Sequence, residues 1–146
     1  MGRHVVDQWP DPPAAWSPEL RRDFVAGVGS GVVGTRLVSE TDRVRVWHLC
    51  LGPGERIGFH THVLDYFWTV MTSGRARSRY DDGSTREVSY TAGDTQHLRY
   101  AAGQSMIHDL ENIGDTELVF ATVEFLDSAN AALAVPEDKR APDRAA

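Results

Sequence analysis

Nine short segments rich in β-branched and aromatic residues follow one another along the chain, and stretches that contain glycine, proline or aspartate separate most of them. The segments cover residues 32–39, 44–51, 56–62, 66–72, 75–80, 86–90, 95–100, 105–112 and 117–126. Short strands at this spacing are typical of an antiparallel sandwich or barrel. Parallel strands would need crossover helices, and residues 32–126 have almost no helical periodicity. We therefore predict an all-β fold.

The strand pattern occupies only the middle of the chain. A length of 146 residues, with 41% hydrophobic and 25% charged residues, fits one ordinary domain. We divide it into an irregular N-terminal arm (residues 1–30), a single barrel (residues 31–127), and a short C-terminal segment that ends in a mobile tail (residues 128–146). The tail is expected to be mobile because it is charged and rich in alanine and proline.

The N-terminal arm contains four prolines, which disfavour a regular core element there. One short helical turn is expected from Pro18 to Val25, because Ser17 is a suitable N-cap and proline fits the first helical position. The large rings of Trp9 and Trp16 need cover. We expect the arm to bury them against the barrel or against a dimer partner.

Charge and cysteine content exclude several classes of protein. The formal net charge of −6 and the pI near 5.4 argue against nucleic acid as a partner, since that affinity comes from clustered lysine and arginine. The single cysteine, Cys50, excludes an internal disulfide, and we expect it to act as a small buried hydrophobe. No signal peptide and no membrane-spanning stretch is recognised, so we expect a cytoplasmic protein without membrane association.

Two histidines on one strand are the first candidate functional residues. His60 and His62 are two residues apart in an extended segment, so both imidazoles point to one face, together with Arg56 and Gly58. Two converging imidazoles suit a transition metal. His108 lies on another strand-like segment and is a candidate third ligand. The simpler interpretation is three polar barrel histidines bonded to water or neighbours, but their joint spacing favours metal.

Two groups of residues resemble the two sequence motifs of the cupin family. The first motif is matched by Gly54, His60, His62 and Gly74, and the second by Gly93, Asp94, Gly103, His108 and Asn112. The resemblance covers roughly residues 32–126 and implies the family's double-sheet jelly roll, in agreement with the strand pattern. The chain is also similar to small bacterial cupins of the type linked to β-alanine degradation. That similarity implies the fold and the metal-binding face, and no particular reaction.

The chain departs from the family motifs at two places. The family's metal-binding glutamate should fall at position 66 or 67, where this chain has Tyr66 and Phe67, and no proline precedes Gly103. The resemblance implies a metal site of His60, His62 and His108, with the fourth position filled by Asp65, Tyr66, water or substrate. Regular strand pairing places Tyr66 on the histidine side. A bulge after Val63 would instead turn Asp65 toward the metal.

Several other side chains share a face with the histidines. They are Tyr66, Trp68, Met106 and Leu110, which form either a pocket wall or plain core. Arg56 is a candidate for binding an anionic group of the substrate, with a salt bridge as its alternative role. A row of arginines at positions 75, 77 and 79 is expected to be a solvated face paired with nearby acidic residues. His48 is expected to be packed in the core and His97 to be partly buried.

The expected ligand set suits a divalent transition metal. Three neutral imidazoles leave such an ion its full charge, so iron(II) is favoured and zinc, manganese or nickel are alternatives. We predict a three-histidine non-haem oxygenase acting on a small and possibly anionic organic molecule, with Tyr66 and Arg56 as catalytic candidates. The alternatives are a non-redox lyase, isomerase or cyclase, and a binding protein without turnover. Exposed sheet edges lead us to expect a homodimer.

Overall fold

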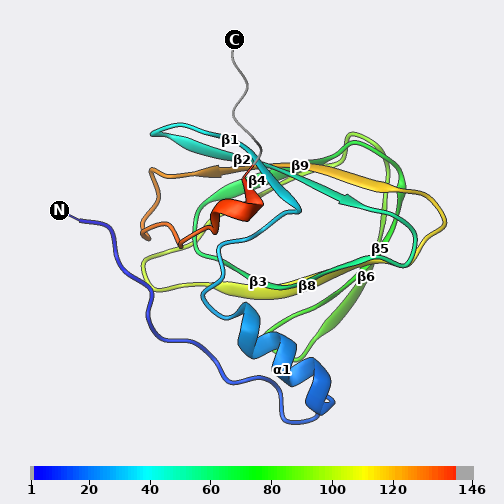
Figure 1. Ribbon diagram of the computed structural model, residues 1–146, viewed down its shortest axis with the longest axis horizontal. Helices are drawn as coiled ribbons and strands as arrows, with labels where there is room; N and C mark the ends of the chain where they lie inside the picture. The colour runs from blue at the N-terminus through cyan, green and yellow to red at the C-terminus, as the bar shows by residue number, and fades with distance from the viewer. Residues whose placement is uncertain (1, 141–146) are drawn as a thin grey trace.

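The computed structural model describes residues 2–140, which form two packed antiparallel sheets and one helix (Figure 1). The elements are α1 (Pro18–Gly27), β1 (Arg36–Glu40), β2 (Val44–Leu51), β3 (Arg56–His62), β4 (Tyr66–Val70), β5 (Gly74–Arg79), β6 (Thr85–Tyr90), β7 (Thr95–Leu98), β8 (Met106–Asn112), β9 (Leu118–Phe125) and the short 3-10 helix η1 (Glu137–Lys139). One sheet has the order β1-β2-β9-β4-β7 and the other β3-β8-β5-β6. The predicted all-β double-sheet jelly roll is confirmed.

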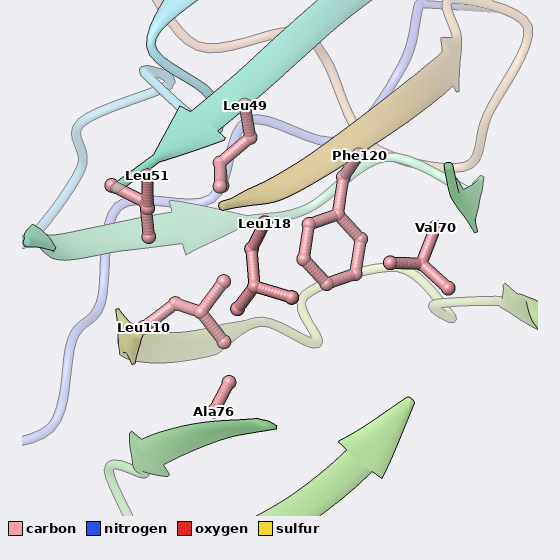
Figure 2. Close-up of a cluster of buried hydrophobic side chains, with 7 residues drawn as sticks. All are labelled: Leu49, Leu51, Val70, Ala76, Leu110, Leu118 and Phe120. Atoms are coloured by element: carbon pink, nitrogen blue, oxygen red, sulfur yellow. The ribbon is translucent and has the colours of Figure 1, made fainter. Parts of the chain in front are cut away.

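Apolar side chains from both sheets meet between them and form the main core. Figure 2 shows this cluster, which consists of Leu49, Leu51, Val70, Ala76, Leu110, Leu118 and Phe120. Five of them come from the five-stranded sheet, whereas Ala76 on β5 and Leu110 on β8 come from the facing sheet. Burial of these side chains holds the two sheets together at one end of the barrel.

Helix α1 covers the outer face of β3 and β8, below the four-stranded sheet in Figure 1. Its N-terminus is as predicted, because the Ser17 hydroxyl accepts a hydrogen bond from the Leu20 amide at 3.2 Å. The helix is longer than the single turn expected and ends at Gly27. A side chain at Gly27 would collide with the carbonyl oxygen of Phe59, so glycine permits the close packing of helix on strand.

Aromatic rings fill the interface between α1 and the sheet. Phe24 is fully buried and packs edge-on against Phe59 at 5.3 Å, and Ile107 of β8 lies in the same cluster. Trp16 stacks on Phe59 with 5.3 Å between ring centroids. Trp9 packs against two apolar clusters of the barrel. The two tryptophans of the arm are therefore covered by the protein's own barrel.

Strand β3 contains a bulge that the alternation of its residues does not reveal. The pairing of β3 with β8 shifts by one residue between Ile57 and His60. Ile57 packs toward the main core, Phe59 packs outward under α1, and His60 faces inward again. The expectation that Arg56 shares the histidine face is therefore wrong, because the bulge reverses the parity of the side chains between them.

Strand β2 also faces the opposite way from the prediction. His48 and Cys50, expected in the core, are exposed, whereas Trp47 and Leu49 are buried. Trp47 and Leu49 are larger than the valines of the other face. Their burial therefore removes more apolar surface from water than burial of the valines would. His97, expected to be partly buried, is exposed and lies 5.2 Å from the Phe67 ring.

Residues 141–146, the end of the tail expected to be mobile, lie outside the described residues. Within residues 2–140, no helix combines the length and the apolar character needed to cross a membrane. The homodimer stays a prediction, to be checked by sedimentation at micromolar concentration.

The packing of α1 predicts a large loss of stability for one substitution. Phe24→Ala should lower the free energy of unfolding by about 3 to 5 kcal/mol, because it removes a fully buried ring between α1 and β3. Val25→Ala is the matched control on the same helix, since Val25 is 60% exposed and should change stability by less than about 0.5 kcal/mol. Urea denaturation measures both. Equal losses in the two variants would contradict the placement of the helix.

Candidate metal centre

Neighbouring strands of the four-stranded sheet bring three histidines together. His60 and His62 lie on β3, and His108 lies directly opposite His60 on β8. One ring nitrogen of each histidine lies within 4.8 Å of the others, and these three side chains form the only such group of potential metal ligands among residues 2–140. His60 and His62 are buried, and His108 is half-buried at the wall of a pocket. The predicted set of three histidines is therefore assembled in space.

Hydrogen bonds orient the imidazole rings only in part. Nδ1 of His60 lies 2.9 Å from the carbonyl oxygen of Gly58, so it donates a proton there and leaves Nε2 as the free lone pair. The Nδ1 atoms of His62 and His108 are buried and have no hydrogen-bond partner within the described part of the chain. Their Nε2 atoms face each other at 3.1 Å.

The imidazoles are held in the neutral form that binds metals. Burial lowers the pKa of His60 to about 4. Burial, reinforced by the neighbouring imidazoles, lowers the pKa of His62 well below its usual value, and burial next to His60 does the same for His108. All three rings are therefore neutral at neutral pH, so each has one ring nitrogen with a free lone pair and none carries a positive charge.

The geometry fits a bound divalent ion. Two nitrogens that each lie about 2.1 Å from one ion are separated by about 3.0 to 3.4 Å at ordinary coordination angles. The 3.1 Å between the Nε2 atoms of His62 and His108 falls in this range. Without an ion, two lone pairs face each other unless one of the nitrogens carries a proton, whereas a cation satisfies both. Imidazole nitrogens as the only protein ligands favour iron, zinc, nickel or copper over calcium or magnesium.

Tyr66 occupies the neighbourhood in which the motif would place a glutamate. Its ring stacks on His62 with 4.2 Å between centroids and 12° between planes, and Tyr100 stacks on its other side at 6.3 Å. Burial, followed by the nearby Tyr100, raises the pKa of Tyr66 well above its usual value. Tyr66 is therefore a protonated phenol that can donate a hydrogen bond into the site.

Asp65 lies outside the histidine group. Its Oδ1 accepts a hydrogen bond from the Tyr100 amide at 2.9 Å, and its backbone is held by Ser128 and Phe125. The strand from Tyr66 onward pairs regularly with β9, so the bulge that would have turned Asp65 inward is absent from this pairing. The structure thus has the arrangement with Tyr66 rather than Asp65 beside the histidines.

A cavity of about 290 Å³ opens beside the three histidines. The side chains predicted as a pocket wall, Tyr66, Trp68, Met106 and Leu110, all line it. Trp68 makes edge contacts with Tyr90 and Phe120, at 5.4 and 5.5 Å, which stiffen the apolar side of the cavity. The size and the lining suit a small organic molecule rather than a polymer.

Arg56 does not reach the cavity and does not line it. Its guanidinium donates to Asp23 of α1 at 2.7 Å and to Asp109 of β8 at 2.8 Å. Asp109 is fully buried and also accepts from Arg79, at 2.8 Å. Arg56 therefore joins the helix to the outer face of the sheet behind the histidines, and the anion-binding role expected for it has no support from its position.

Two motif positions have structural roles. The Asn112 amide donates to the carbonyl oxygens of Leu51 and Thr116, at 2.9 and 2.8 Å, and its Oδ1 accepts from Gly114 at 3.0 Å. It thus ties the end of β8 to β2 of the facing sheet and to the following turn. Gly54 has φ of 80°, a left-handed conformation that glycine adopts without strain.

Sequence reasoning missed several residues that line the cavity, notably Tyr80 and Arg86. The Tyr80 ring lies 5.4 Å from the ring of His108. The sequence of β5 could have indicated this part of the cavity, because small residues such as Ala76 and Ser78 alternate with arginines there. Small residues on one face leave room for a cavity, and β6 pairs with that face through Arg86 and Val88.

No family model and no curated protein matches the chain, but many solved structures share its fold. A cupin domain from Bordetella pertussis superposes with a TM-score of 0.52 and is 28% identical, over 60% of this chain and 85% of that one. A protein with a double-stranded β-helix domain from Klebsiella pneumoniae superposes with a TM-score of 0.50 and is 26% identical, over 68% of this chain and 75% of that one.

The histidine group predicts a loss of metal on substitution. His60→Ala, His62→Ala and His108→Ala should each lose most of the bound zinc or iron, because each removes one of three ligands. His97→Ala is the control, since His97 is exposed and outside the group. Elemental analysis of dialysed protein measures the metal, and far-UV circular dichroism checks the fold. Full metal content in His108→Ala would remove that residue from the site.

The position of Asp65 predicts that its charge is dispensable for metal binding. Asp65→Asn keeps an oxygen that can accept from the Tyr100 amide, so zinc affinity should stay within about tenfold of the parent protein. Competition with a chromogenic chelator measures this affinity. A loss of about a hundredfold or more, the scale expected when a ligand is removed, would show that Asp65 binds the ion.

Proposed function

The chain belongs to the cupin superfamily, and from this premise we propose that it is a metal-dependent enzyme acting on a small organic molecule. The activity we favour is that of a three-histidine non-haem oxygenase using iron(II). The observation that supports it most directly is the convergence of three neutral imidazoles, without a carboxylate, at the wall of a largely apolar cavity. A protein that binds a ligand without turning it over is the less favoured alternative to this enzyme.

The chemistry divides between the ion and the protein. A divalent ion held by three imidazoles would supply Lewis acidity and, as iron(II), reactivity toward O2. The side chains hold the substrate beside the imidazoles and exclude bulk water through Trp68, Leu110 and Phe120. Tyr66 lines the cavity with its ring stacked on His62, and it is the proposed hydrogen-bond donor to the reacting substrate.

A second candidate is a non-redox reaction at the same site, such as that of a lyase, isomerase or cyclase. The observation that favours it is that three phenol side chains, Tyr66, Tyr80 and Tyr90, line the cavity. Phenols can take up and release protons from an enolisable substrate when their pKa values are suitably placed. Burial raises the pKa of Tyr90 to about 12, which makes it a weak acid. Tyr80 lies next to the candidate metal ligands, with its ring 5.4 Å from the ring of His108, and is the group proposed for this role.

Oxygen uptake by the iron(II) protein tests the proposal. Pools of small thiols, enols and carboxylic acids are offered to the iron-loaded and zinc-loaded proteins, and an oxygen electrode and mass spectrometry record uptake and products. We expect uptake with at least one compound, only with iron, and none in His108→Ala. Turnover without oxygen by the zinc protein would favour the lyase or isomerase. Binding without turnover under either metal would favour the binding protein.

Tyr66→Phe separates a role in turnover from a role in holding the ion. The variant keeps the ring that stacks on His62 and loses only the hydroxyl. We expect kcat to fall by about a hundredfold, the usual scale for a lost proton-donating group, with metal content unchanged. Loss of metal in this variant would instead make the phenol oxygen a ligand.

A further inference from the structure

Only two of the residues that line the cavity carry a formal charge at neutral pH, Arg86 and Asp94. The Asp94 carboxylate is engaged in its own turn, where Oδ2 accepts a hydrogen bond from the Thr91 amide at 2.8 Å. Arg86 is the only cationic side chain of the lining. The protein as a whole carries a net charge of −6, which repels anions. The attraction for an anion in this cavity must therefore come from Arg86 itself.

Arg86 differs from every other arginine of the four-stranded sheet. Arg56 is paired with two aspartates, and the row on β5 is paired with Glu87, Glu111 and Asp109. No carboxylate among residues 2–140 forms an ion pair with Arg86. The arginines on the outer face of this sheet are therefore ion-paired, and the one that lines the cavity is not. The nearest acidic influence on Arg86 is the exposed Asp82, whose carboxyl pKa is lowered chiefly by hydrogen bonds from Ser84 and to a lesser extent by the charge of Arg86.

The pairing of the strands explains why Arg86 faces inward. It lies on the edge strand β6, opposite the buried Ser78, and the next pair on the same face is Ala76 with Val88. Side chains of a directly opposite pair lie on the same face of a sheet. Arg86 thus belongs to the row that borders the cavity, together with Val88 and Tyr90. It is exposed, and so lies at the mouth rather than the floor.

Tyr80 links Arg86 to the histidines. The guanidinium carbon of Arg86 lies over the Tyr80 ring, 5.4 Å from its centroid, and the same ring lies 5.4 Å from the ring of His108. A guanidinium that sits over an aromatic face keeps its N–H groups available for an anion at its edge. One phenol ring therefore separates a free pair of donors at the mouth from the candidate metal ligands.

We propose that Arg86 binds the carboxylate of the substrate, so that the protein selects small organic acids whose opposite end reaches the three histidines. A planar guanidinium matches a carboxylate with two parallel hydrogen bonds, and one guanidinium balances a single negative charge. A phosphate, with its higher charge, calls for more donors than this mouth provides. This inference rests on the proposed metal-dependent function and names the class of substrate for it.

Two matched probes test the inference without requiring the natural substrate. Both carry a hydroxamate, which binds divalent metal, at one end of a three-carbon chain. One has a carboxylate at the other end and the second has a carboxamide. Isothermal titration of the zinc-loaded protein should show that the carboxylate binds about tenfold more tightly, the size of one charge-assisted hydrogen-bonded pair. The difference should shrink at high salt.

Substitutions assign the preference to Arg86. Arg86→Gln should bind both probes with the affinity that the parent protein has for the carboxamide, and Arg86→Lys should keep part of the preference. Arg75→Gln is the control, because Arg75 is exposed on the outer face and pairs with Glu87. Since Arg86 is exposed and makes no ion pair, Arg86→Gln should keep the parent's melting temperature and zinc content.

The outcomes separate this inference from the proposed function. Equal affinity of the parent protein for both probes, or a preference that survives in Arg86→Gln, would overturn the assignment while leaving the metal site intact. Failure of both probes to bind would overturn the metal site and this inference with it. A third probe that ends in a phosphonate covers the other anion, and tighter binding of it than of the carboxylate would overturn the choice of substrate class.

Discussion

The bulge in β3 is the constraint on which the histidine group depends. It lets Phe59 turn outward to α1 while His60, the next residue, turns inward, so that one short segment serves both the packing of the helix and the site. Asp23 of α1 holds the bulge from outside, because its carboxylate accepts from the Phe59 amide at 3.3 Å. The Gly58 carbonyl holds it from inside by orienting the ring of His60. A side chain at Gly58 would lie 3.2 Å from the Asp23 carboxylate, so glycine lets this carboxylate approach the bulge without a shift.

The outer face of the same two strands explains why a β-barrel carries a helical arm. Phe59 and Ile107 point away from the barrel interior and would leave an apolar patch in water. Helix α1 covers this patch with Phe24, and the ion pairs of Arg56 with Asp23 and Asp109 fix the helix at its edge. Because Asp109 is fully buried, the two arginines that pair with it are needed to compensate its charge. Packing behind the site thus determines how rigidly the histidines are presented.

The strands and the histidine group were predictable from the sequence, because alternation and the spacing of His60, His62 and His108 are local signals. The face of the sheet on which an individual side chain lies was harder to predict from the sequence. A bulge inserts one residue without any change in composition, so Arg56 was placed on the wrong face. In β2, both alternating rows contain apolar residues, and only the partner sheet decides that Trp47 rather than His48 is buried. Arg86 could not be recognised, because its position depends on pairing with β5 and on the absence of a partner carboxylate.

Tyr66 and Arg86 together give the site a consistent charge balance. A cupin motif with a glutamate would supply one negative charge next to the ion, whereas here a neutral phenol stacks on His62 and Asp65 is turned to the Tyr100 amide. The protein ligands are then all neutral, and a bound divalent ion keeps its full charge. Low dielectric around the cavity strengthens the attraction of that charge for an anion, and the unpaired guanidinium at the mouth adds to it. An organic acid supplies the negative charge that the three histidine ligands lack, and so the absence of the glutamate and the presence of Arg86 favour the same class of substrate.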